Sequence, residues 1–157
     1  ILSNKVLLSF LSEFGCSEDV PNTRWLGNTL SSKTDKYAKR LKQAIENKDN
    51  LVLKRDDSLQ GNHVFFGDEK PLLEWTDLLE KAVAEGNWIV QEKLNGPQAE
   101  YLTGNKETKS GYFIASPYIF GEQNGGVVAR IRLNENNKVC VVPGKSETII
   151  STVVKDG

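Results

Sequence analysis

Lys54 is the first residue whose type and position could support chemistry. It ends a short apolar run, Leu51-Val52-Leu53, and residues 55–62 separate it from the next apolar run. A loop of this kind could fold over a phosphate group, with backbone amides around the oxygens and the lysine ammonium supplying positive charge. A solvated lysine at the end of a strand would have the same pattern, so both interpretations stay open.

The second candidate is the extended segment Gln91-Glu92-Lys93-Leu94. The main chain of an extended segment can offer a carbonyl and an amide to the edge of a purine, which gives specificity without a special side chain. The alternative is an ordinary amphipathic strand.

The N-terminal third of the chain must supply helices around these candidates. Apolar residues recur at helical spacing over 6–14, residues 15–32 are rich in Gly, Pro, Asn and Ser, and a second helix is expected after Ser32. In that helix Leu41, Ala44 and Ile45 share the buried stripe. The other faces are basic and form either an anion-binding patch or a solvated surface; they carry Lys33, Lys36, Lys39, Arg40 and Lys42.

From Leu51 the pattern becomes that of strands. We expect 51–54 and 63–67 to pair as an antiparallel hairpin, a third helix around Trp75 and Leu79 that ends before Gly86, and a strand over 88–94 in an adjoining sheet. Beyond Asn105 strands are expected at 112–120, 127–133, 138–142 and 148–154. Their short connections favour antiparallel neighbours.

This order of elements predicts an α+β fold of antiparallel sheets with helices packed on one face. A chain of 157 residues fits a single domain. We divide it into a helical lead-in over 1–50, a hairpin, helix and strand over 51–94, and antiparallel strands over 95–157.

Composition excludes several classes of function. Lys and Arg number 20 against 21 Asp and Glu, so there is no electrostatic reason to expect nucleic acid or an anionic membrane as a partner. Two cysteines, Cys16 and Cys140, and the single histidine His63 cannot build a thiolate or imidazole metal site, and a reducing, cytoplasmic setting fits best. The chain has no methionine, which leads us to expect a piece of a longer polypeptide.

Taken together in order, "LVLKRDDSLQGNHVFFG" and "NWIVQEKLNGP" resemble the nucleotide-binding core of the ATP-grasp family. The segments "SNKVLLSFLSE", "VPNTRWL" and "YFIASPYIFGEQNGGVVARIRL" look like the circularly permuted branch related to glutathionylspermidine synthase. The resemblance implies an ATP-grasp-like fold and the C-terminal, ATP-binding portion of an ATP-dependent carboxylate–amine ligase. Its cofactors would be ATP and Mg²⁺, its substrates a small carboxylate and an amine, and its partner the remainder of the parent chain.

The resemblance also implies roles for single residues. Lys54 would contact the nucleotide phosphates, and Gly61 would belong to the phosphate loop. Glu92 and Leu94 would offer main-chain atoms to adenine, with Gln91 and Lys93 beside them. We expect Lys54 and the 91–94 segment to line one nucleotide-sized cleft between two layers of sheet.

Two further positions follow from the resemblance. Gln98 falls where related sequences often have an acidic residue that binds ribose. Arg130 is a candidate catalytic residue that would bind phosphate or carboxylate. Alternatively, Arg130 and Arg132 merely share one sheet face with a carboxylate partner.

The phosphate loop departs from the family pattern. Arg55 replaces a proline, and Gln60 and His63 replace glycines that allow close backbone approach and positive φ. No acidic pair stands out as a magnesium site, and Asp56 and Asp57 are the nearest carboxylates. The isolated chain is therefore predicted to fold, to bind ATP weakly at best and to lack ligase activity. The alternative function is a non-catalytic binding module that retains the ATP-grasp fold.

Overall fold

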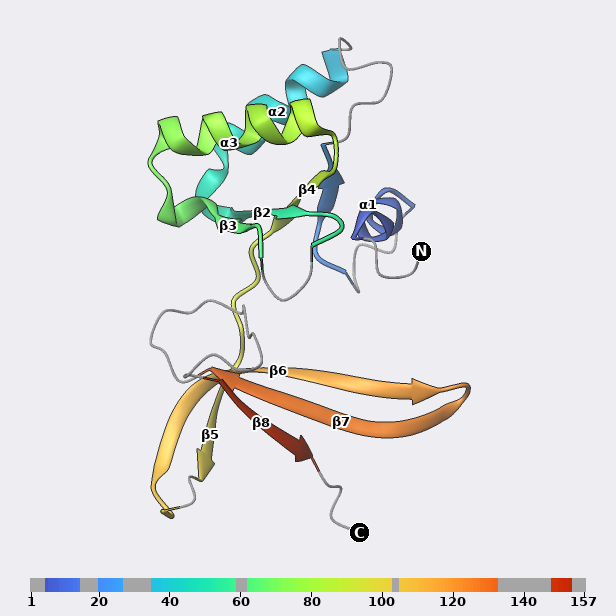
Figure 1. Ribbon diagram of the computed structural model, residues 1–157, viewed down its shortest axis with the longest axis vertical. Helices are drawn as coiled ribbons and strands as arrows, with labels where there is room; N and C mark the ends of the chain where they lie inside the picture. Colours follow the sequence, from blue (N-terminus) through green and yellow to red (C-terminus); the bar gives the residue numbers. More distant parts are fainter. Residues whose placement is uncertain are drawn as a thin grey trace. The chain divides into compact units, whose positions relative to one another are not determined.

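The chain folds into two compact units, Ile1–Lys93 and Leu94–Gly157 (Figure 1). The computed structural model describes residues 5–14, 20–26, 35–58, 62–102, 105–132 and 148–153. Within these residues, each unit contains one four-stranded antiparallel sheet. Helices together with antiparallel sheets confirm the α+β class, and the predicted segment 51–94 ends beside the boundary between the units.

In its described part, the first unit combines three α-helices with one sheet in the order β1-β4-β2-β3. Its elements are α1 (Val6–Glu13), β1 (Thr23–Trp25), α2 (Asp35–Glu46), η1 (Lys48–Asn50), β2 (Leu51–Arg55), β3 (Val64–Phe66), η2 (Gly67–Glu69), α3 (Leu72–Glu85) and β4 (Trp88–Glu92).

The predicted hairpin is confirmed, because β2 and β3 pair antiparallel with Lys54 opposite Val64. The expectation that 88–94 lies in an adjoining sheet is wrong. Strand β4 lies in the same sheet, between β1 and β2, with Lys54 opposite Ile89. Strand β1 was not predicted and forms the sheet edge next to β4.

Helix α3 has a sequence that determines both its ends and its buried face. Pro71 occupies the N-cap, and Gly86 follows the last turn in the left-handed conformation with φ 77°. The Gly86 N–H donates to the Ala82 carbonyl at 3.0 Å, as expected for a glycine at a helix C-terminus. Trp75 and Leu79, one turn apart, are both fully buried.

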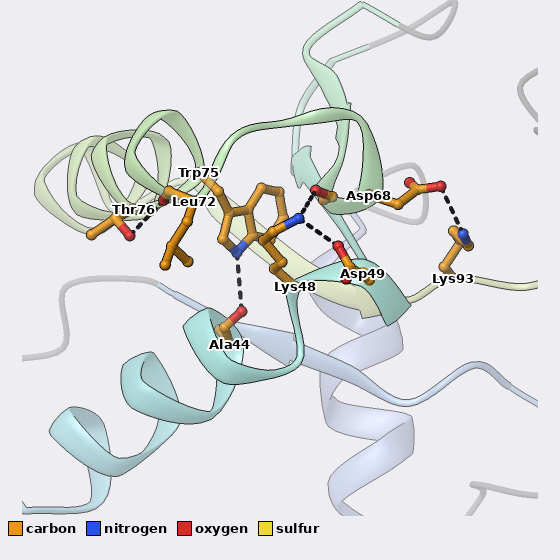
Figure 2. A network of polar contacts seen from close by, with 9 residues as sticks. Ala44, Lys48, Asp49, Asp68, Leu72, Trp75, Thr76 and Lys93 are labelled. Atoms are coloured by element: carbon orange, nitrogen blue, oxygen red, sulfur yellow. Dashed lines mark hydrogen bonds and ion pairs between the residues drawn. The ribbon is translucent and has the colours of Figure 1, made fainter.

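The core lies between one face of the sheet and helices α2 and α3. Strand alternation places Leu53 of β2 and Trp88 and Val90 of β4 on this face, where they pack with Ala44 of α2 and the buried residues of α3. The Trp75 indole N–H donates to the Ala44 carbonyl at 3.0 Å and so joins the two helices (Figure 2). Burial of the tryptophan therefore leaves no unpaired donor on its ring.

A close backbone contact joins η1 and η2. A Cβ atom on Gly67 would lie 1.9 Å from the Lys48 carbonyl oxygen, so only glycine fits there. The Lys48 ammonium donates to the Gly67 carbonyl at 3.0 Å. The two short helices that flank the hairpin are thus held against each other.

Helix α1 corrects the expectation that all helices pack on one face. It lies along the outer edge of β1, where Ser9 Oγ accepts the Trp25 N–H at 3.0 Å and Ser12 Oγ accepts the Thr23 N–H at 3.1 Å. Its apolar residue Phe10 is 49% exposed. The expectation holds for α2 and α3.

The second unit is an antiparallel sheet in the order β5-β6-β7-β8. Its strands are β5 (Gln98–Leu102), β6 (Thr108–Phe120), β7 (Gln123–Arg132) and β8 (Thr148–Val153). Strand β5 was not predicted, and the expected strand at 138–142 lies outside the described residues. Gly121, with φ 62°, provides the left-handed residue in the tight turn between β6 and β7. Within the described residues, no helix is long and apolar enough to cross a bilayer.

Candidate functional site

Lys54 and Gln91 lie on the same face of the first sheet and contact each other. Lys54 pairs with Ile89 and Gln91 pairs with Val52, so the two side chains are diagonal neighbours on adjacent strands. The Lys54 ammonium donates to Gln91 Oε1 at 2.5 Å. The structure thus brings together the two segments that the sequence singled out.

This contact continues as a hydrogen-bonded row to β1. Gln91 Nε2 donates to Thr23 Oγ1 at 2.8 Å, and Thr23 Oγ1 donates to the Pro21 carbonyl at 2.7 Å. Gln91 is 5% exposed and Thr23 is fully buried. Both ends of the Gln91 amide are therefore occupied, and its oxygen is held toward the ammonium of Lys54. We call these three residues the Lys54–Gln91–Thr23 row.

Two backbone N–H groups at the end of β4 already donate hydrogen bonds to residues that precede β1 and β2. The Glu92 N–H donates to the Asn22 carbonyl and the Lys93 N–H to the Asn50 carbonyl, both at 2.8 Å. Lys93 Nζ lies 3.0 Å from an Asp68 carboxylate oxygen. Figure 2 draws this ion pair as a dashed line. Leu94 follows the strand and is 54% exposed.

The loop between β2 and β3 begins and ends within the described residues, but Gly61 lies outside them. The Arg55 N–H donates to the His63 carbonyl at 3.2 Å and closes the loop. His63 itself has φ 53°, in the left-handed region that favours glycine. Its ring lies edge-on to Trp88, with centroids 6.2 Å apart.

Lys5 anchors the start of this loop, a role that the sequence did not reveal. Its ammonium donates to the carbonyls of Arg55 at 3.0 Å, Asp56 at 3.3 Å and Ser58 at 2.5 Å. Burial lowers the pKa of Lys5, and burial together with the neighbouring Asp57 raises the pKa of Asp56. Asp56 is a buried residue at the start of the loop, whereas Asp57 is exposed.

The remaining predicted residues lie in the second unit. Gln98 begins β5 and its Nε2 donates to the Tyr112 hydroxyl at 2.9 Å. Arg130 lies in β7 opposite Ile114 of β6 and Ile150 of β8, and its side chain is outside the described part of the structure. Over the described ranges there is no group of three or more His, Cys, Asp or Glu that could hold a metal ion.

A polar groove beside α2 was missed by the sequence analysis as a site. It has a volume of about 370 Å³ and lies between α2, β1 and the ends of β2 and β4. Its polar lining consists of Asn22, Arg24, Arg40, Gln43, Asn47, Asn50 and Glu92. A second hollow of about 420 Å³ shares four of these residues, namely Asn22, Arg24, Arg40 and Gln43.

The basic residues of α2 differ in how exposed their side chains are. The Arg40 side chain is 24% exposed and its Nη2 lies 2.6 Å from Glu13, whereas the Lys42 side chain is 75% exposed. The solvated-surface interpretation therefore fits Lys42 but not Arg40. The sequence signal that could have found the groove is Arg24, a charged residue between Thr23 and Trp25 in a short β-prone run.

Comparison with known proteins does not assign a family. No protein-family model matches the chain, and no curated protein is significantly similar to it.

Proposed function

We propose that this chain is the ATP-binding portion of an ATP-dependent carboxylate–amine ligase. The observation that carries the proposal is the contact between the Lys54 ammonium and Gln91 Oε1, at 2.5 Å. It unites the strand before the loop with the strand that precedes Leu94, in the arrangement expected if one nucleotide spans both. The sequence resemblance to the permuted ATP-grasp branch supports the same assignment, together with a cytoplasmic location.

In this proposal Lys54 supplies positive charge to the ATP phosphates, and the loop after it covers them. Because the N–H groups of Glu92 and Lys93 donate within the sheet, adenine is assigned to the Glu92 carbonyl and the main chain of Leu94. Gln91 has no direct contact with the nucleotide here. Its role is to hold the ammonium of Lys54, because both ends of its amide are fixed.

The reaction would proceed in two steps. A carboxylate oxygen of the acid attacks the γ-phosphorus of ATP, which yields an acyl phosphate and ADP. The amine then attacks the acyl carbon, and inorganic phosphate leaves as the amide forms. Mg²⁺, when bound, would neutralise charge on the phosphates. Arg130 is our candidate for binding phosphate or carboxylate.

The second candidate is a non-catalytic binding module with the same fold. The observation that favours it is His63, which replaces a loop glycine and has φ 53°. A side chain with a Cβ atom at this position makes the loop bulkier where phosphate oxygens would need close backbone approach.

Calorimetric titration with Mg·ATP tests the proposal. Replacing Lys54 with alanine should weaken binding by about 1.5–3 kcal/mol, the usual contribution of a charged hydrogen bond. Lys81→Ala is the matched control, because that lysine lies on α3 with a side chain 69% exposed. Equal affinity of the wild type and Lys54→Ala for Mg·ATP would mean that the nucleotide binds elsewhere. If neither the wild type nor His63→Gly binds Mg·ATP, the result would favour the non-catalytic module.

A further inference from the structure

Arg24 places a guanidinium in the groove beside α2 that forms no ion pair within the described residues. Arg24 Nη1 donates to Gln43 Oε1 at 2.7 Å, and glutamine is neutral. Within the part of the chain that the structure describes, no carboxylate lies within ion-pair distance of Arg24. Arg40, which lines the same groove, is already paired with Glu13. The groove therefore offers one guanidinium with unused donors.

A guanidinium in a concave site suits a carboxylate. Its planar fork can bind both carboxylate oxygens at once, and partial shielding from water strengthens such a pair. A volume of about 370 Å³ is at the small end of the range of ligand-binding pockets, so the ligand is small.

Glu92 provides a second, opposite charge in the same groove. Arg24 pairs with Val90, and Glu92 lies two residues further along β4, so the two side chains are diagonal neighbours on the same face. Glu92 Oε2 accepts the Asn22 N–H at 3.3 Å and forms no ion pair with a described residue. This carboxylate would repel a dianion and attract an ammonium group. The amide residues Gln43, Asn47 and Asn50 also line the groove.

We propose that the groove binds a small zwitterion, an amino acid or a short peptide. Its carboxylate binds Arg24, its ammonium binds Glu92, and the amide side chains hydrogen-bond to its polar middle. The proposal does not rest on ATP binding, because it uses the Glu92 side chain on the helix-covered face, whereas Lys54 lies on the opposite face and adenine is assigned to the Glu92 main chain. It is therefore tested in the absence of nucleotide.

The experiment is a titration of the ¹⁵N-labelled chain, followed by NMR, with alanyl-alanine and matched probes. The probes are its N-acetyl form, its C-terminal amide, and alanine. We expect saturable shifts at the amides of Asn22, Asn47 and Asn50 with alanyl-alanine. The C-terminal amide should bind about tenfold or more weakly, because it lacks the charged contact with Arg24. The relative affinities of alanine and alanyl-alanine distinguish an amino acid from a peptide as the occupant.

Variants tie the binding to the two charges. Arg24→Gln should weaken alanyl-alanine about tenfold or more, and Lys81→Gln, which removes an exposed charge from α3, should leave it unchanged. If Arg24→Gln does not fold, Glu92→Gln still tests the proposal. In that variant the N-acetyl form and the free dipeptide should bind equally, whereas in the wild type the free dipeptide should bind more tightly. Absence of saturable shifts, or equal binding of the acid and its amide, would overturn the proposal.

Discussion

The sequence and the backbone conformation are in conflict at His63, which is one of two non-glycine residues with positive φ in the described part of the chain, the other being Lys106. A residue with a Cβ atom at φ 53° is strained by about 1–2 kcal/mol, and glycine relieves this strain at an entropic cost of about 0.5–1 kcal/mol. We expect His63→Gly to be more stable than His63→Ala by about 0.5–1 kcal/mol in urea unfolding. Both variants lose the ring contact with Trp88, so their difference isolates the backbone term. An alanine variant as stable as the glycine variant would show that the backbone has relaxed.

At the residue scale the sequence predicted the candidates but not their contacts. Lys54 and Gln91 were singled out separately, since each occupies a position that a local pattern reveals. Their contact depends on the register between β2 and β4, which joins residues far apart in the chain. The pairing of Arg40 with Glu13 and the burial of Asp56 are likewise tertiary features, so helix periodicity and loop composition could not reveal them.

Ser9 and Ser12 of α1 are expected to stabilise the outer edge of β1 by accepting its backbone N–H groups. An edge strand has unpaired N–H groups, and here two of them donate to serine hydroxyls. Ser9 is buried, so Ser9→Ala leaves the Trp25 N–H without an acceptor and should cost about 1–3 kcal/mol of unfolding free energy. Hydrogen exchange of the Trp25 amide should accelerate in the variant more than exchange of the Arg24 amide.

The control for this prediction is Ser58→Ala, because the Ser58 hydroxyl donates to the carbonyls of Asn62 and Arg55 at the β2–β3 loop and not to a group of β1. Equal exchange of the Trp25 amide in Ser9→Ala and in the wild type would contradict the proposed role of α1.

At the scale of elements, the long and strongly periodic segments were predictable. The described α-helices, α1, α2 and α3, and the β2–β3 hairpin follow from local apolar spacing and from signals such as Gly86. Strand β1 was missed because Thr23–Trp25 is only three residues long and is stabilised by distant partners, namely β4 and the serines of α1. Strand β5 was missed because its ends, Gln98 and Leu102, are exposed and give no clear alternation.

At the scale of the whole molecule, the two units differ in how much apolar surface they bury. Among the residues whose burial is described, the second unit contributes Ile131 to the buried hydrophobic side chains, and the others belong to the first unit. The first unit also has two helices packed over its sheet, whereas the elements described in the second unit are strands. Hydrophobic burial is the main stabilising term in folding, so the two units should differ in independent stability.

We therefore expect a chain that ends at Lys93 to fold alone, and a chain of residues 94–157 not to. The hydrogen-bonded partners of Trp75 and Gln91 all lie within the first unit, so truncation removes none of them. Amide exchange at Leu53, Ile89 and Val90 should be as slow in the truncated chain as in the whole one, and its urea unfolding should remain cooperative. Rapid exchange at these three amides would mean that the first sheet depends on the second unit. A folded 94–157 fragment would mean that side chains beyond those described here complete a second core.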